Sequence, residues 1–158
     1  MNILIIYDSL YGNTKTIAET LGKNFSSPHK VRLLNATHAK THDFKGAGLV
    51  IVGSPTHGGR AKPTLQEFLD HIPNETLKDI PVAVFDTRLD ITKQPFLLRL
   101  LMNIIGYAAP KIGKILENKG GNLITPPEGF FVTGKKGPLP KEELDRAKAW
   151  GKTIQQKI

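Results

Sequence analysis

Residues 2–16 read NILIIYDSLYGNTKT, which predicts a strand, a short polar turn and the start of a helix. The apolar run from Ile3 to Ile6 does not alternate with polar residues, which is typical of a strand buried on both faces of a parallel sheet. The helix is predicted to begin at Asn13 and to end at Phe25. A buried strand that passes directly into a helix is the first half of a β-α-β unit.

The same pattern recurs along the chain, where short apolar runs alternate with helical stretches. Further strands are predicted at Lys30–Leu34, Leu49–Gly53, Pro81–Phe85 and Asn122–Ile124. Further helices are predicted at Pro63–His71, Ala109–Lys119 and Lys141–Lys157. The segment Pro126–Pro140 is rich in proline and glycine and is expected to be a long surface loop. Because 158 residues suit one core and no linker interrupts the pattern, we expect a single doubly wound α/β domain over residues 1–158.

Composition narrows the classes of function. The 22 basic and 14 acidic residues give a net charge of +8, which indicates an anionic ligand or partner, or a basic solvated face. No RNP-like aromatic motif or zinc-finger spacing accompanies this charge, so a nucleic acid is not an expected partner. The chain has no cysteine, so redox chemistry would need an imported cofactor. No apolar stretch reaches the roughly 20 residues that span a bilayer, and no leader precedes the first strand, so we expect a cytoplasmic protein without a membrane role.

The loop Asp8–Thr16 is a candidate phosphate-binding turn. Ligands of open α/β sheets bind at the carboxyl ends of the strands, and this loop offers backbone N–H groups, a helix N-terminus and the hydroxyls of Ser9 and Thr14. The alternative is an ordinary helix cap, in which a hydroxyl satisfies the helix amides. The loop has neither the G-x-G-x-x-G fingerprint nor the P-loop motif, and the second strand ends at Asn35 instead of the acid expected for an NAD ribose. The third strand ends in Gly53-Ser54 without an aspartate, which disfavours a phosphoacceptor receiver domain.

Two further loops follow the third and fourth predicted strands. Residues 53–63 (GSPTHGGRAKP) are rich in glycine and suit close approach of a flat ligand to the backbone. Residues 86–90 (DTRLD) follow the fourth strand and are expected to form the third loop of the same site. His57 is either a residue that stacks on the ligand or an exposed loop histidine.

Taken together, the three loops resemble those of the flavodoxin-like family, whose phosphate loop has the form [ST]-x-[ST]-G-x-T. The resemblance covers nearly the whole chain and implies a three-layer fold with a five-stranded parallel sheet in the order 2-1-3-4-5 and flavin mononucleotide (FMN) as cofactor. Tyr11 departs from the usual third-position Ser or Thr, and Leu89 stands where the family often has a stacking tyrosine. By this resemblance the cofactor-binding residues are Ser9, Leu10, Tyr11, Gly12, Asn13 and Thr14 at the phosphate, Pro55, Thr56, His57, Gly58 and Gly59 at the ring, and Asp86, Thr87, Arg88 and Asp90 at its pyrimidine edge.

The segment Ile91–Tyr107 is an addition to a minimal domain of this family. Its core, FLLRLLMNII at residues 96–105, is strongly apolar with helical spacing. The alternatives are an extra buried helix, an interface of a homo-oligomer formed through residues 91–107, and a lid over a hydrophobic substrate. Docking on a membrane surface is a further, less favoured alternative.

The resemblance supports FMN binding more firmly than any particular reaction. The first interpretation is an electron-transfer carrier that works with a redox partner protein. The alternatives are an FMN-dependent reductase that passes electrons from NAD(P)H to a quinone or another small-molecule electron acceptor, and a domain that has lost its cofactor. No acid, base or nucleophile is identified as catalytic, and His38 and His42 lack a third ligand for a metal site. The basic residues Arg60, Lys62 and Arg88 predict a less negative potential for the second electron than in acidic flavodoxins.

Overall fold

The central sheet contains six parallel strands. The computed structural model describes residues 1–158. The strands are β1 (Asn2–Tyr7), β2 (Lys30–Asn35), β3 (Leu49–Pro55), β4 (Pro81–Leu89), β5 (Asn122–Leu123) and β6 (Glu128–Val132). Their order is β2-β1-β3-β4-β5, and β6 also pairs with β4. The predicted α/β class and the order 2-1-3-4-5 are confirmed.

The sixth strand is the second half of a divided fifth strand. β5 pairs with the first two residues of β4, and β6 pairs with the last five. Pro126 and Pro127 lie between them, and a residue without a backbone N–H cannot continue a ladder. The predicted loop Pro126–Pro140 was therefore wrong over 128–132, and the predicted strand at 122–124 ends one residue early.

Pairing with β6 also extends β4 beyond its predicted end. We predicted a strand over Pro81–Phe85 followed by a loop over Asp86–Asp90, whereas β4 continues to Leu89. The register places Thr87 opposite Phe130 and Leu89 opposite Val132, so the additional residues belong to the ladder. The expected third loop is thus mostly the end of a strand, and only Asp90 lies outside it.

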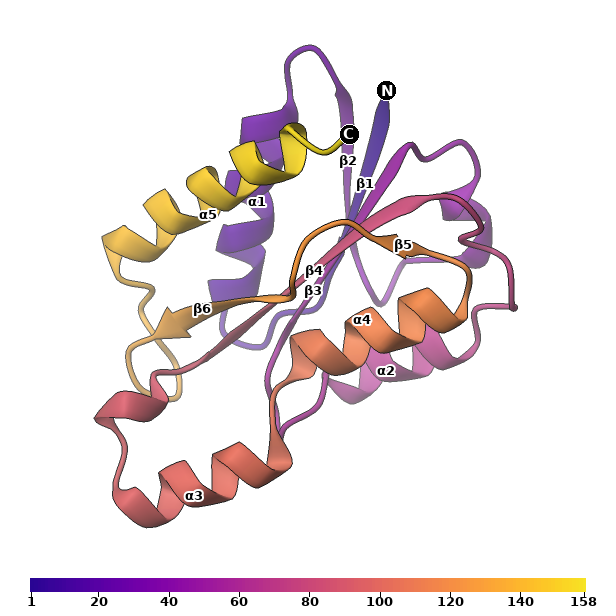
Figure 1. The fold of residues 1–158 in the computed structure, drawn as a ribbon. Coiled ribbons are helices and arrows are strands. Elements are labelled where there is room, and N and C mark those ends of the chain that lie inside the picture. The colour runs from indigo at the N-terminus through magenta and orange to yellow at the C-terminus, as the bar shows by residue number, and fades with distance from the viewer.

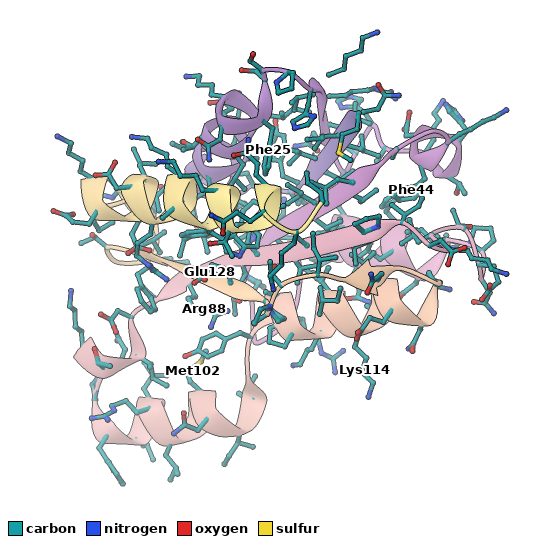
Figure 2. All side chains as sticks on the ribbon, turned by 45° about the horizontal axis from the view of Figure 1, so that its top comes forward. Phe25, Phe44, Arg88, Met102, Lys114 and Glu128 are labelled. Atoms are coloured by element: carbon teal, nitrogen blue, oxygen red, sulfur yellow. The ribbon has the colours of Figure 1, made fainter.

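Helices cover both faces of the sheet in three layers (Figure 1). On one face α1 (Asn13–Phe25) and α5 (Lys141–Gln155) bury Ile3 and Ile5 of β1, together with Trp150. On the other face α2 (Pro63–Asp70) and α4 (Ala108–Asn118) bury Leu4 and Ile6. A 3-10 turn, η1 (Thr41–Phe44), closes the second core. Figure 2 shows Phe25 and Phe44, one from each core.

Helix α3 (Phe96–Ile105) belongs to neither layer. It follows a short 3-10 turn, η2 (Ile91–Lys93), and projects from the end of the molecule where the parallel strands terminate (Figure 1). None of its residues is buried. The interpretation of this segment as an extra buried helix is therefore wrong, because the layers on both faces of the sheet are complete without it.

Candidate functional site

The turn after β1 presents backbone N–H groups that the protein leaves without an acceptor. Gly12 precedes α1 with φ of 92°, and no side chain caps this helix. The Ser9 hydroxyl instead accepts from the Gly12 N–H at 3.1 Å. The N–H groups of Leu10, Tyr11, Asn13, Thr14 and Lys15 make no hydrogen bond within the protein. The alternative of an ordinary side-chain cap is wrong, and the turn has the donors of an anion site at a positive helix end.

Two contacts hold this turn in place. The Thr14 hydroxyl lies 2.8 Å from that of Thr87 on β4, and both residues are buried. The Asn13 side chain donates to the carbonyl of Lys136 at 3.0 Å, which joins the turn to the segment after β6. The start of α1 is thus fixed at the site both to β4 and to the segment after β6.

A buried ion pair lies under the turn. Asp8 is 1% exposed, and one of its carboxylate oxygens accepts from the Lys62 ammonium at 2.7 Å and from the Ser9 N–H at 2.8 Å. Its other oxygen is buried without a partner. The positive charge of Lys62 therefore balances Asp8 and is not free to act on a ligand.

The loop after β3 is a tight two-residue turn. His57 and Arg60 exchange backbone hydrogen bonds of 2.8 and 3.1 Å across Gly58 and Gly59, whose φ values are 55° and 74°. Two successive positive φ angles define a type I′ turn, which glycine adopts without steric cost. Thr56 before the turn donates its N–H to Thr87 and accepts the Ala108 N–H at 3.0 Å through its hydroxyl. The His57 side chain is exposed, so it is free to meet a ligand.

Asp86 and Arg88 of β4 bind each other. Arg88 donates to Asp86 at 2.8 Å and stacks on the ring of Tyr107, 3.7 Å from its centroid. Asp86 also accepts the Ala109 N–H at the start of α4 and is fully buried. Asp90 accepts from Thr92, and the hydroxyl of Thr92 holds the pKa of this carboxyl below its ordinary value. Neither Asp86 nor Asp90 lines the cavity described next; Asp86 instead positions Arg88.

One cavity joins the three segments at the carboxyl ends of the strands. Of the predicted residues it is lined by Ser9, Leu10, Tyr11, Asn13, Thr14, Pro55, Thr56, His57, Thr87 and Arg88. Gly12 shapes the turn without lining the cavity. The site predictions omitted Leu89, Val132, Gly134 and Lys135, which also line it. Three of these come from β6 and the loop after it, and the β-branched and aromatic run at 130–132 was the sequence signal that could have revealed them.

A second, more apolar cavity adjoins the first and shares Thr56, Arg88 and Leu89 with it. Gly58 and Gly59 line it on the side of the loop. Helix α3 and the segment before it contribute Ile91, Gln94, Leu98, Met102 and Ile105. Figure 2 shows Met102 on the side of α3 that faces the body of the molecule, with Arg88 across the space from it. The inner stripe of α3 thus forms one wall of a hollow beside the first cavity.

No metal centre accompanies these cavities. His38 and His42 do not share a helix, since His38 lies in a turn and His42 in η1. No group of three or more histidine, cysteine, aspartate or glutamate side chains is placed to hold a metal ion. No helix combines the length and the apolar content that crossing a bilayer requires.

The sheet order, the turn of unpaired N–H groups after β1 and the glycine turn after β3 define a flavodoxin-like domain. A family model described as a flavodoxin domain matches residues 4–124, and the chain belongs to this family of flavin-dependent electron-transfer proteins. A flavodoxin of Aquifex aeolicus (strain VF5) is 35% identical over 72 residues, which are 44% of this chain and 39% of that protein. The match thus spans about two fifths of the length of that relative.

Solved structures of low sequence identity share the fold. Flavodoxin 2 of Bacillus cereus superposes with a TM-score of 0.77 at 21% identity over 100% of both chains. Rubredoxin oxygen:oxidoreductase of Desulfovibrio gigas gives a TM-score of 0.74 at 20% identity, covering 98% of this chain and 35% of that one. The same fold therefore occurs both as a chain of this length and as part of longer proteins.

Proposed function

We propose that the chain binds FMN in the first cavity and carries electrons between redox partners. The observation that carries this proposal is the set of five unpaired N–H groups around Gly12 at the start of α1. Each hydrogen bond to a charged phosphate contributes roughly 1.5 to 3 kcal/mol, so several together suffice for a phosphate without a lysine clamp. Bound FMN would supply one- and two-electron redox chemistry, which the side chains of this chain do not provide.

The protein's own residues bind and orient the cofactor in this proposal. The hydroxyls of Ser9 and Thr14 and the five unpaired amides hold the phosphate, namely those of Leu10, Tyr11, Asn13, Thr14 and Lys15. Pro55, Thr56, His57 and the Gly58-Gly59 turn flank the ring on one side, and Thr87, Arg88 and Leu89 flank it on the other. Leu89 covers less of a flat ring than a tyrosine would, which leaves the second cavity open beside it. Asp86 acts indirectly, because it fixes the guanidinium of Arg88.

The second cavity favours a second candidate function, an FMN-dependent reductase. Its apolar wall on α3 adjoins the space proposed for the ring, and a small-molecule electron acceptor that binds there would lie near the cofactor. Transfer between a flavin and such an acceptor needs little beyond positioning. Inertness toward NADH and NADPH, in protein that dithionite reduces under anaerobic conditions, would favour the carrier. Rapid bleaching by either nucleotide would favour the reductase.

A comparison of FMN with riboflavin tests the proposed site directly. The two ligands share the ring and differ in the phosphate, so the phosphate turn predicts tighter binding of FMN. Titration of apoprotein followed by quenching of flavin fluorescence should give an affinity for FMN at least 100-fold higher, since the difference of about 3 kcal/mol is that of one or two charged hydrogen bonds. Equal affinities would remove the phosphate turn from the site. Binding of neither ligand would favour a domain without a cofactor.

A further inference from the structure

Helix α3 carries an outward apolar face that nothing in the molecule covers. Phe96, Leu97 and Ile104 are 78%, 77% and 77% exposed, and Leu100 and Leu101 are about half exposed. The opposite stripe of the same helix, Leu98, Met102 and Ile105, faces the second cavity. A soluble helix normally turns one apolar stripe inward and a polar face outward. The outward face of α3 is therefore expected to be buried against another molecule or a membrane.

Basic side chains without an ion-pair partner lie on this helix and beside it. Arg99 is exposed on α3, and Lys111 donates to the carbonyl of Ile105 in the last turn of the helix. Arg60 follows Gly59, which lies against Ile105. None of these three residues forms an ion pair with a carboxylate, and Asp90, which precedes the helix, is paired with Lys93. The rim of the apolar face thus carries positive charge without compensation.

We propose that α3 docks the protein on an anionic lipid surface, with its outward side chains among the acyl chains and the basic rim at the headgroups. A helix that is apolar on one side and basic at its border binds such surfaces in two ways. Its apolar side chains are buried among the acyl chains, and its basic side chains are attracted to the anionic headgroups. Charge argues against a second copy as the covering surface, because a symmetric pair would bring two basic rims together. The helix projects from the body of the molecule (Figure 1), so its outward side chains can reach a lipid surface without obstruction by the sheet or its covering helices.

Co-sedimentation with vesicles tests the docking. Wild-type protein should sediment with phosphatidylglycerol vesicles at low salt, and with phosphatidylcholine vesicles at least tenfold less. The double variant Leu97→Ser/Ile104→Ser should lose at least tenfold in partitioning, and Arg99→Glu severalfold. Ile158→Ser and Lys23→Glu are the matched controls, since both residues are exposed and distant from α3, and they should bind as wild type does. The substituted α3 residues are exposed, so the variants should keep the wild-type circular dichroism.

Three outcomes would overturn the proposal. The first is no binding to phosphatidylglycerol, and the second is equal binding by wild type and the Leu97→Ser/Ile104→Ser variant. The third is a wild-type dimer in solution that this variant converts to monomer, which would make the face an interface between copies. The vesicle measurement does not depend on FMN, so its failure is distinguishable from failure of the proposed cofactor site.

Discussion

Gly12 is the residue on which the phosphate turn depends most. Its φ of 92° lies in a region that other residues adopt at a cost of about 1 to 2 kcal/mol, although a Cβ at this position would meet no neighbouring atom. Gly12→Ala should therefore distort the turn without creating a clash. We expect FMN affinity to fall at least tenfold, measured by fluorescence titration, because the amides before and after residue 12 would no longer converge on one phosphate.

Gly46 provides the control for this substitution. It also has a positive φ, 76°, and open space at its Cβ, but it lies before β3 at the opposite edge of the sheet. Gly46→Ala should lower the free energy of unfolding by a similar amount and leave FMN affinity unchanged. If both variants lost affinity equally, the loss would reflect general destabilisation.

The sequence indicates which residues lie together most directly where they are neighbours in the chain. Ser9, Gly12 and Thr14 follow one another in the motif and meet in the structure. The sequence did not reveal that Lys62 pairs with Asp8, because this contact depends on where β1 ends and α2 begins in space. It did not reveal the pairing of Arg88 with Asp86 either, because residues 86–90 were expected to be a loop, whereas both residues lie in β4. It also missed Lys135, which reaches the cavity through the strand β6 that two prolines concealed.

At the scale of elements, Lys111 ties α3 to the rest of the molecule. Its ammonium donates to the carbonyl of Gly59 at 2.6 Å and to that of Ile105 at 2.8 Å. Lys111→Met should remove both bonds and free the C-terminal turn of α3. We expect faster amide hydrogen exchange over residues 96–105, with exchange in β1 and β3 unchanged.

Lys114, one turn further along α4, is the matched control. Its side chain is exposed on the outer side of α4 (Figure 2) and makes no hydrogen bond or ion pair. Lys114→Met should leave exchange in α3 as in wild type. Equal acceleration in both variants would indicate an effect of lost charge on α4 and not of the two carbonyl contacts.

Asp43 in η1 makes stability depend on pH in the acid range. Burial by itself raises the pKa of Asp43, but the hydrogen bond from the Lys40 N–H and the pairing with Arg32 outweigh it and hold the pKa below 3.8. A lowered pKa in the folded state adds stability that is complete above the unfolded value, near pH 4, and is lost as the pH falls through the folded value.

Asp43→Asn tests this contribution. At pH 7 the free energy of unfolding should drop by about 2 kcal/mol, because the ion pair with Arg32 and the acceptor for Lys40 are weakened. The difference from wild type should shrink at pH 3, measured by urea unfolding. Glu117→Gln on the exposed side of α4 should show no such difference at either pH.

The predicted elements were most accurate where hydrophobic periodicity is strong. The starts of β1, β2, β3 and β4 and both ends of α1 agree with the structure. The errors lie where pairing across the sheet determines the element, as for the end of β4 and for β6. The sequence did not determine where α3 lies for a similar reason. Its apolar residues are typical of a buried helix, but the helix layers on both faces of the sheet are complete without it.

At the scale of the whole molecule, fewer cations act on the proposed cofactor than the sequence predicted. Lys62 and Arg88 are neutralised by buried carboxylates, which leaves Arg60 and Lys135 near the cavity. Exposed cations contribute about 1 kcal/mol each at high effective dielectric, equivalent to about 40 mV for one electron. Arg60→Gln/Lys135→Gln should therefore make the potential of the second electron more negative by tens of millivolts.

A spectroelectrochemical titration of FMN-loaded protein measures this shift. Lys23→Gln/Lys152→Gln removes the same charge from exposed helix positions that do not line either cavity, so the control should leave the potential nearly unchanged. High salt should reduce the shift in the first variant, because exposed charges are screened. A shift of equal size in both variants would assign the effect to net charge alone.

The two carbonyls that Lys111 holds belong to the last turn of α3 and to the glycine turn beside the proposed ring. A force that moves one therefore moves the other, and thermodynamic linkage works in both directions. If docking of α3 on a lipid surface changes the free energy of reducing the bound flavin, then reduction of the flavin changes the free energy of docking by the same amount. The Lys111 ammonium would then link the docking of α3 to the redox state of the bound flavin in a single equilibrium.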